Sequence, residues 1–415
     1  PYNYGKQYQI NEFYPGKLAE LKSPYILRDY RGQSISFYPF QYNPVTKVLR
    51  VYHSLIVKAT NIGISNYNNL QRTKTFTKVD GEFKSIYKTQ FINSNSGNTK
   101  YTPVEENGKM LIICPDQYMS SMMPLVKWRN ISGIPTQIVS VTTAGNTNTA
   151  IKSYISNYYN TNGLTYVILV GDVADIPTFT AAGGGSDNSY GYLLGNDHYP
   201  EVFIGRISAE SFVHVNTQVQ KILTYEMNPS NGNGWLNRGT GIASSEGPGD
   251  NNEYDYQHIR NIRTKLMSYE YSSCSELYDG NQGGVDATGN PTTAMVSSDV
   301  NNGVGIMYYT GHGSDNSWVT SGFSNTQVSS LTNTTAWPFT ISVACVNGNF
   351  TTGTCFAETW MRATSNEQPT GAVATLMSTI NQSWNPPMCG QDAMIDILTE
   401  SVQGNIKRTF GGITM

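Results

Sequence analysis

The 415-residue sequence carries 27 basic and 30 acidic side chains, for a formal net charge of −3. Without a basic excess it gives no support to nucleic-acid binding, and without a run of 18 apolar residues it predicts no membrane span. Charged residues make up only 14 %, whereas 28 tyrosines and 39 glycines are present. This balance favours a protein that works outside the cell over a cytosolic one.

The cysteines are few, widely scattered and odd in number. They therefore predict neither a disulfide framework nor a CxxC metal site, and at least one thiol is expected to be unpaired. An unpaired thiol in an extracellular protein raises the question of its role. The five residues are Cys114, Cys274, Cys345, Cys355 and Cys389.

The first hundred residues are predicted to form a small antiparallel β unit. Residues 34–40 and 48–57 are β-branched and aromatic, and Asn-Pro and Gly turns join such segments. No helical pattern is recognised among them. Residues 93–100 are polar and turn-rich, which is typical of an exposed linker.

From residue 101 onward, apolar runs alternate with helical patterns. This alternation predicts a three-layer α/β architecture with a mainly parallel sheet. The predicted strands are 110–114, 137–141, 166–170, 202–204, 241–243, 304–309, 339–344 and 372–377. The predicted helices are 117–130, 148–159, 214–227, 253–268, 356–363 and 391–402. In open α/β sheets ligands gather beyond the carboxyl ends of the strands, so chemistry is expected just after these runs.

Two predicted strands end in residues suited to nucleophilic catalysis. One runs into His312, which stands between two glycines, and the next ends at Cys345. If the strands are parallel neighbours, both side chains emerge at one edge, where an imidazole converts a thiol into a thiolate. The amide of Gly313, paired with that of Cys345, is a candidate oxyanion hole. Taken singly, such a cysteine is more often inert and such a histidine more often part of a tight turn.

Several longer motifs resemble the gingipains, a family of secreted bacterial cysteine peptidases. The segments around His312 and Cys345 match the catalytic segments of that family, and the likeness covers essentially residues 101–415. The resemblance implies a caspase-like three-layer α/β sandwich in two subdomains, 101–212 and 213–415, with 1–100 as a small all-β propeptide unit. The other matching segments are 101–105, 169–172, 195–199, 201–206, 378–384, 390–392 and 406–412.

The resemblance also assigns roles to single residues. It implies that Cys345 is the nucleophile, that His312 is the general base, and that Glu246 orients the histidine. A carboxylate beside a catalytic histidine is expected physically, because it fixes the tautomer and stabilises the imidazolium. The alternative for Glu246 is a solvated loop acid.

A specificity pocket follows from the same comparison. Asp255 matches the acid at the floor of the primary pocket in arginine-specific gingipains, and Trp384 and Met388 match its apolar walls. A carboxylate beneath a flat apolar slot suits a guanidinium group, which it can bind through two parallel hydrogen bonds. The expected substrates are therefore proteins and peptides with a basic residue, preferably arginine, before the cleaved bond.

Acidic, carbonyl-rich loops predict calcium as the cofactor, because oxygen ligands on short loops suit calcium better than zinc or copper. The resemblance implies carboxylate ligands from three residues, backbone oxygens from two more, and a second site with a further pair. His198 has no second His or Cys near it that would make a zinc site. In the order just given, the implied ligands are Asp172, Asp197 and Glu201, then Leu194 and Tyr199, then Glu253 and His258.

The β unit at 1–100 is then expected to inhibit the enzyme until the bond between Lys100 and Tyr101 is cut. Lysine before this bond disagrees with the arginine preference that Asp255 implies, unless another peptidase makes the cut. A secreted or bacterial outer-surface location is expected. The resemblance also implies that family members continue past the position of Met415 with another helix and an immunoglobulin-like domain.

Three other functions remain open from the sequence. One is a peptidase that prefers lysine or accepts both cations. Another is a catalytically silent homologue that serves as an adhesin or binding module, which the intact Cys–His–Glu set disfavours. The third is an unrelated α/β hydrolase, disfavoured because no Gly-x-Ser-x-Gly segment is present.

Overall fold

The computed structural model describes residues 5–60, 63, 65–71, 79–94, 108–228 and 234–414. The chain divides into two compact units. One consists of Pro1–Thr73 with Tyr192–Glu201, and the other of Lys74–Gly191 with Val202–Met415. The predicted processing bond between Lys100 and Tyr101 lies outside the described residues.

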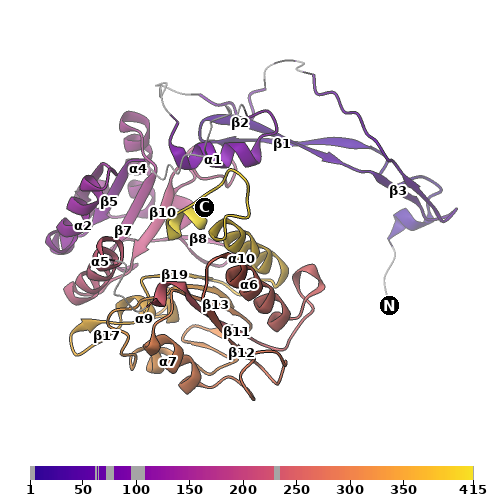
Figure 1. The fold of residues 1–415 in the computed structure, drawn as a ribbon. Helices are drawn as coiled ribbons and strands as arrows, with labels where there is room; N and C mark the ends of the chain where they lie inside the picture. The colour runs from indigo at the N-terminus through magenta and orange to yellow at the C-terminus, as the bar shows by residue number, and fades with distance from the viewer. Residues whose placement is uncertain are drawn as a thin grey trace. The chain divides into compact units, whose positions relative to one another are not determined.

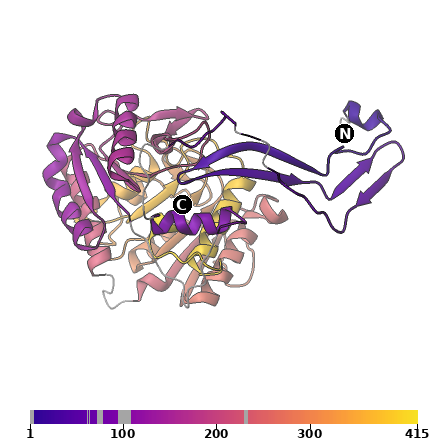
Figure 2. The ribbon, with the colours of Figure 1, turned by 90° about the horizontal axis from the view of Figure 1, so that it is seen from above.

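The first unit is built from two antiparallel strand pairs, as the β-rich sequence predicted. Strands β1 (Ala19–Leu27) and β2 (Tyr30–Phe37) form a long ribbon, which Figure 2 shows in indigo. Strands β3 (Phe40–Asn43) and β4 (Val48–Val51) form the other pair.

The loop Tyr192–Glu201 packs against the end of β1 within this unit. The backbone N–H of Ile26 donates to Asp197 Oδ2 at 2.8 Å, and Arg28 Nη1 donates to the carbonyl oxygen of Glu201 at 2.9 Å. The rings of Tyr25 and Tyr199 stack at 4.4 Å between centroids. The loop is therefore tied to the ribbon by backbone, side-chain and ring contacts.

The second unit begins with a helix that was not predicted. Helix α1 (Gly81–Gln90) lies within the stretch for which no helical pattern was recognised, so that prediction was wrong here. Phe83 and Tyr87, four residues apart, are its buried apolar residues, and Phe83 stacks on Phe203 at 4.9 Å. The apolar residues of this helix, Phe83, Ile86 and Tyr87, fall within little more than one helical turn, which is too short a pattern to indicate a helix by itself.

A four-stranded parallel sheet forms one half of the second unit (Figure 1). Its strands, in spatial order, are β10 (Phe203–Ile207), β7 (Tyr166–Val170), β5 (Met110–Cys114) and β6 (Thr136–Ser140). Apolar side chains of these strands share a buried cluster with the helices α2 and α5. The helices of this half are α2 (Met119–Ile131), α3 (Val141–Ala144), α4 (Asn148–Asn162) and α5 (Phe212–Met227).

A five-stranded parallel sheet forms the other half. Its strands, in spatial order, are β12 (Ser273–Tyr278), β11 (Arg238–Ala243), β13 (Ile306–Thr310), β16 (Phe339–Val343) and β19 (Ala374–Met377). One buried cluster joins its strands to α6, α10 and α11, and another joins them to α7, α8 and α9. The helices are α6 (Asp255–Tyr269), α7 (Thr293–Asn302), α8 (Asn325–Val328), α9 (Phe356–Arg362), α10 (Asn385–Leu398) and α11 (Phe410–Ile413).

Strand β12 and helix α7 were not predicted. Strand β12 has the polar sequence Ser-Cys-Ser-Glu-Leu-Tyr and buries Glu276, whose charge Arg260 neutralises at 2.8 Å. A buried carboxylate is tolerated in a strand only with such a partner, and the sequence pattern does not show the partner.

Among the described residues, no helix combines the length and apolarity that crossing a membrane requires.

Short elements complete the described structure. The remaining strands pair as β8 (Phe179–Ala181) with β9 (Gly184–Ser186), β14 (Gly313–Ser314) with β15 (Ser317–Trp318), and β17 (Thr364–Ser365) with β18 (Gln368–Pro369). The 3₁₀ helices are Lys6–Gln9, Asp116–Tyr118, Asp187–Tyr190, Trp235–Asn237 and Asp250–Asn252.

Candidate active site

The candidate nucleophile and base leave neighbouring strands at the same edge of the five-stranded sheet. Strands β13 and β16 are parallel, and their register places Thr310 beside Val343. His312 follows the end of β13 and Cys345 follows the end of β16, each by two residues. The two strands are therefore parallel neighbours, as the prediction from the sequence required.

His312 is held by a carboxylate from the strand on its other side. Its Nε2 lies 3.0 Å from Oε2 of Glu246, which follows β11, and both side chains are about half exposed, at 48 % and 57 %. The ring of Trp384 lies edge-on to the imidazole, with 5.1 Å between centroids. The carboxylate and the indole together restrict the orientation of the imidazole.

The five cysteines differ in their access to solvent, and all are free thiols. Burial raises the pKa of Cys114 and of Cys355 to about 12 each, and it also raises the pKa of Cys274. These three thiols are therefore poor sources of thiolate. Cys345 is half-buried, with its Sγ 3.9 Å from the carbonyl oxygen of Gln382, and Cys389 is exposed. Of the two accessible thiols, Cys345 is the one that follows a strand beside His312.

Gly313 permits the segments that carry His312 and Cys345 to approach closely. A Cβ atom at this position would stand 2.7 Å from the carbonyl oxygen of Cys345 and 2.8 Å from Nδ2 of Asn347. Contacts this short are essentially absent between real side chains and backbone, so only glycine fits here. The structure thus brings the predicted oxyanion residue against the backbone of the predicted nucleophile.

The predicted pocket residues form one cluster. Asp255 is fully buried at the start of α6, where its carboxylate accepts a hydrogen bond from Trp384 Nε1 at 2.7 Å and another from the hydroxyl of Ser244. Burial raises the pKa of Asp255, and the two hydrogen bonds oppose that rise. Met388 is also fully buried, and a Cβ on Gly249 would lie within 3 Å of both Met388 and Trp384. Trp384 therefore connects the carboxylate of Asp255 with the ring of His312.

A buried amide on α10 links three elements of this cluster, and sequence reasoning gave it no role. Gln391 Oε1 accepts from Thr310 Oγ1 and lies within hydrogen-bond distance of His258 Nε2, both at 2.9 Å. Its Nε2 lies 3.3 Å from the carbonyl oxygen of Tyr309. Gln391 follows Met388 by three residues on the same helix, so the helical period was the signal that could have indicated it.

The carboxylates of the first predicted set of calcium ligands already have partners within the protein. Glu201 is buried and accepts hydrogen bonds from the backbone N–H groups of Leu193 and Leu194, at 2.7 and 2.9 Å, and burial raises its pKa to about 7. Asp197 accepts from the backbone N–H of Tyr199 at 3.0 Å as well as from Ile26. These carboxylates thus stabilise the loop itself.

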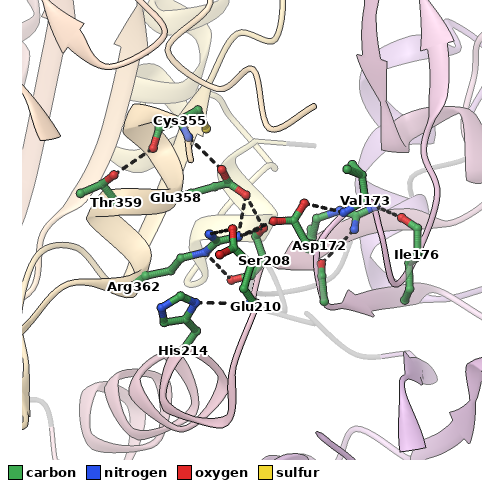
Figure 3. A network of polar contacts seen from close by, with 12 residues as sticks. Asp172, Val173, Ile176, Ser208, Glu210, His214, Cys355, Glu358, Thr359 and Arg362 are labelled. Carbon is green, nitrogen blue, oxygen red and sulfur yellow. Dashed lines mark hydrogen bonds and ion pairs between the residues drawn. The ribbon is translucent and has the colours of Figure 1, made fainter. Parts of the chain in front are cut away.

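Asp172, placed in the same predicted set, is part of a different network (Figure 3). Its Oδ2 lies 3.1 Å from Nη2 of Arg362, on α9. The same guanidinium bonds Glu358 at 2.7 Å and Glu210 at 2.8 Å. Calcium binding by Asp172 would have to compete with this arginine.

The second predicted pair surrounds an unsatisfied buried nitrogen. His258 is fully buried, and its Nδ1 has no hydrogen-bond partner among the described residues. That nitrogen lies 3.6 Å from Glu253 and 3.7 Å from Asp392. Two carboxylates that face an imidazole nitrogen without a hydrogen-bond partner are groups that could act as ligands of one cation. Over the described part of the chain, however, no group of three or more His, Cys, Asp or Glu residues is placed to hold a metal ion.

A cysteine beside a histidine–carboxylate pair at the edge of a parallel sheet is the arrangement of a thiol hydrolase. The comparisons with known proteins agree with this class. The model of peptidase family C25 matches residues 104–415, and the model named Propeptide_C25 matches residues 1–95. The chain belongs to peptidase family C25.

The chain is similar over its whole length to gingipain R2 of Porphyromonas gingivalis strain W83, with 44 % identity across 428 aligned residues. It spans only 56 % of that relative. Identity to the Lys-gingipain of another strain of P. gingivalis is 24 %, covering 98 % of this chain and 23 % of the relative.

Solved structures confirm the caspase-like α/β fold. The crystal structure of the Arg-specific cysteine proteinase gingipain R has a TM-score of 0.70 at 43 % identity and covers 76 % of this chain and 73 % of that one. The complex of the pro- and mature domains of P. gingivalis RgpB has a TM-score of 0.69 at 42 % identity, covering 74 % and 72 %.

Proposed function

We propose that the chain is a cysteine endopeptidase in which Cys345 is the nucleophile, His312 the general base and Glu246 the residue that orients the imidazole. The observation that carries this proposal is the 3.0 Å contact between His312 and Glu246 at the sheet edge from which Cys345 also emerges. Because Nε2 faces the carboxylate, Nδ1 is the nitrogen left to take the thiol proton.

The proposed reaction passes through an acyl-enzyme. The Cys345 thiolate attacks the carbonyl carbon of the scissile bond, and the oxygen of that carbonyl takes up the negative charge. The backbone N–H groups of Gly313 and Cys345 would stabilise this oxyanion. Collapse of the intermediate expels the amine, which takes its proton from the His312 imidazolium. Water, activated by the same imidazole, then hydrolyses the thioester and restores the thiol.

Arginine is the proposed residue before the cleaved bond. Trp384 and Ser244 each hold one oxygen of the Asp255 carboxylate, so the carboxylate has a fixed plane with lone pairs to spare for a guanidinium fork. The higher identity to gingipain R2 than to Lys-gingipain supports the same preference. A preference for lysine, or for both cations, is the alternative that Lys100 supports.

Paired peptide reporters that differ only in arginine or lysine test this function. After cleavage at Lys100–Tyr101 and removal of residues 1–100, the wild-type enzyme should cleave the arginyl reporter much faster, and Cys345→Ala should abolish cleavage of both. Cys389→Ala, which removes the other accessible thiol, should leave the rates unchanged. Faster lysyl cleavage would exclude Asp255 as the pocket floor, and cleavage by Cys345→Ala would exclude the nucleophile.

We further propose that residues 1–95 hold the peptidase latent. In the first unit, Ile26 and Arg28 bond the loop that contains Asp197 and Glu201. In the second unit, Glu82 and Lys407 form a buried ion pair. Both contacts join the part that matches the propeptide model to the part that matches the peptidase model. They support a propeptide that stays attached to its own enzyme, as the solved complex of pro- and mature domains shows for RgpB.

Calcium is the proposed metal. Since no group of three His, Cys, Asp or Glu residues in the described structure is placed to hold an ion, Glu253, His258 and Asp392 would have to draw together around the orphaned Nδ1 of His258. Asp172, Asp197 and Glu201 would first have to release their present partners. A bound ion would supply positive charge that ties loops together and stabilises the folded state.

Secretion, or display on a bacterial outer surface, is proposed from the composition and the relatives. The intact Cys–His–Glu set argues against a silent adhesin.

A further inference from the structure

A buried amide joins the segment that follows Cys345 to the segment that follows His312. Asn347 is fully buried, two residues beyond Cys345. Its Nδ2 donates to the carbonyl oxygens of Ser314 and Ser317, at 2.7 and 2.9 Å. These acceptors belong to the hairpin β14–β15, which begins directly after His312. Both N–H groups of the Asn347 side chain therefore bond to this hairpin.

The other side of the amide is fixed as well. Asn347 Oδ1 accepts from the hydroxyl of Ser342, on β16, at 2.9 Å, and that hydroxyl accepts from Trp318 Nε1, also at 2.9 Å. The indole donor and the backbone acceptors leave only one orientation in which every group of the amide is satisfied. The result is a closed, buried ring of contacts that runs from β16 through Asn347 to β15 and back.

The backbone between Cys345 and Asn347 is strained and needs to be held. Val346 has a φ of +51°, a conformation that a β-branched residue rarely adopts. Its N–H donates to the carbonyl oxygen of Ile380 at 3.0 Å. Strain of this kind persists only where the surroundings over-determine the conformation, and it gathers at functional sites. The bonds of Asn347 and Val346 are the restraints on this turn.

We propose that Asn347 is the positioning residue that sets Cys345 against His312, an inference that rests on the proposed Cys–His mechanism. Asn347 touches neither the substrate nor the reacting atoms. It fixes the carbonyl groups of the hairpin after His312 relative to the turn after Cys345, and it works beside Gly313, which leaves the space that this close approach needs. Loss of its two donors lets the segments separate and weakens the transfer of the thiol proton to the imidazole.

The same sheet offers a matched control. Asn333 is buried and precedes β16 at the opposite end of that strand from Cys345. Its Nδ2 donates to the carbonyl oxygens of Ala336 and Gly371, at 2.7 and 2.8 Å, and its Oδ1 accepts from the N–H of Gly371 at 3.0 Å. Asn333→Asp and Asn347→Asp therefore remove the same kind of contact at the two ends of one strand, and only the second faces the site.

The test measures how fast iodoacetamide alkylates Cys345 at about pH 6, where an ordinary thiol carries little thiolate and reacts slowly. The chain is first cut at Lys100–Tyr101 with an added lysine-specific peptidase and then diluted until residues 1–100 dissociate, so that they do not shield the thiol. Mass spectrometry of the peptide that contains Cys345 gives the rate. The same chain unfolded in urea gives the rate of an unassisted thiol.

Wild-type Cys345 should react faster folded than unfolded. Asn347→Asp should lose about tenfold or more of the folded rate at pH 6 and much less at about pH 9, where an unassisted thiol also ionises. Asn333→Asp should lower the melting temperature similarly and leave the rate within about twofold. Ser342→Ala, which removes one support of Asn347, should lower the rate less, by about threefold.

The outcomes separate this inference from the mechanism on which it rests. If wild-type Cys345 reacts no faster folded than unfolded, the proposed Cys–His mechanism fails. If wild-type Cys345 is fast and Asn347→Asp behaves like Asn333→Asp, the positioning role is overturned and Asn347 serves stability alone. Should Asn347→Asp not fold, Ser342→Ala decides by the same comparison, and a rate equal to that of Asn333→Asp overturns the inference.

Discussion

The indole of Trp384 donates a 2.7 Å hydrogen bond to the buried carboxylate of Asp255. The same indole lies edge-on to the ring of His312, at 5.1 Å between centroids. One side chain therefore contacts both the acid proposed to recognise the substrate and the base proposed to act on it. A guanidinium bound to Asp255 would therefore lie close to His312, as cleavage directly after arginine would require.

Replacing Asp255 separates recognition from stability. A lost, desolvated charge pair costs about 2–5 kcal/mol, so Asp255→Asn should lower kcat/KM for the arginyl reporter by about 30-fold to several thousand-fold. Because burial raises the pKa of Asp255, its ionised form costs stability at neutral pH, and the variant should not melt at a lower temperature there. Asp299→Asn, on α7, should leave kcat/KM unchanged. Equal losses of kcat/KM in the two variants would show that Asp255 does not bind the arginine side chain.

The ion pair between Glu82 and Lys407 should anchor the propeptide. Both side chains are nearly inaccessible, and removing one partner of a buried pair typically costs about 3–5 kcal/mol. In a dilution series of the chain cut at Lys100, the propeptide of Glu82→Gln should therefore dissociate, and inhibition of the enzyme should be lost, at a higher protein concentration than in wild type. Glu20→Gln breaks an exposed pair with Lys22 and should have little effect. Identical dilution curves for wild type and Glu82→Gln would show that this ion pair does not hold the propeptide.

Lys221 should give stability a distinctive pH dependence. Its ammonium group is fully buried against the carbonyl oxygens of Met361 and Thr370, at 2.7 and 3.0 Å, and burial lowers its pKa from 10.5 to about 7. Between these two values the unfolded chain binds more protons than the folded chain, so this group makes stability rise with pH. The melting temperature of wild type minus that of Lys221→Met should thus increase from about pH 7 to about pH 9. Parallel curves would show that Lys221 keeps its ordinary pKa.

Removal of calcium should destabilise the fold. Chelation should lower the melting temperature of the wild-type chain, and added calcium should restore it, because an ion that binds only the folded state stabilises it by mass action. Glu253→Gln removes one of the carboxylates beside the orphaned Nδ1 of His258 and should reduce this response. A melting curve that neither chelator nor calcium shifts would exclude calcium from the second site.

Much of the fold could be predicted because strands buried on both faces are continuous apolar runs. Strands β5 and β7 have the predicted bounds, 110–114 and 166–170. Helix α1 and strand β12 were missed because their stability comes from partners distant in sequence, Lys407 for Glu82 and Arg260 for Glu276. Local patterns contain no information on such pairs.

In the candidate site, too, local patterns indicated residues at strand ends but not residues whose partners are distant in sequence. Cys345 and His312 could be predicted because they stand where apolar runs end, and the resemblance supplied Glu246, Asp255 and Trp384. Asn347 and Gln391 act through buried amides whose partners appear only once the chain is folded. The calcium ligand sets remain predictions, since Asp172 is bonded to Arg362 instead.

Labelling with an arginyl active-site probe tests the central claim most directly. A peptidyl acyloxymethyl ketone that ends in arginine reacts with a thiolate held beside the pocket that binds its side chain, and mass spectrometry identifies the modified residue. After cleavage at Lys100–Tyr101 and removal of residues 1–100, the arginyl probe should modify Cys345 alone, and both His312→Ala and Asp255→Asn should slow the reaction strongly. A lysyl probe of the same length should react much more slowly. Modification of Cys389 or of any other residue in place of Cys345, or faster labelling by the lysyl probe, would contradict an arginine-directed peptidase built on Cys345 and His312.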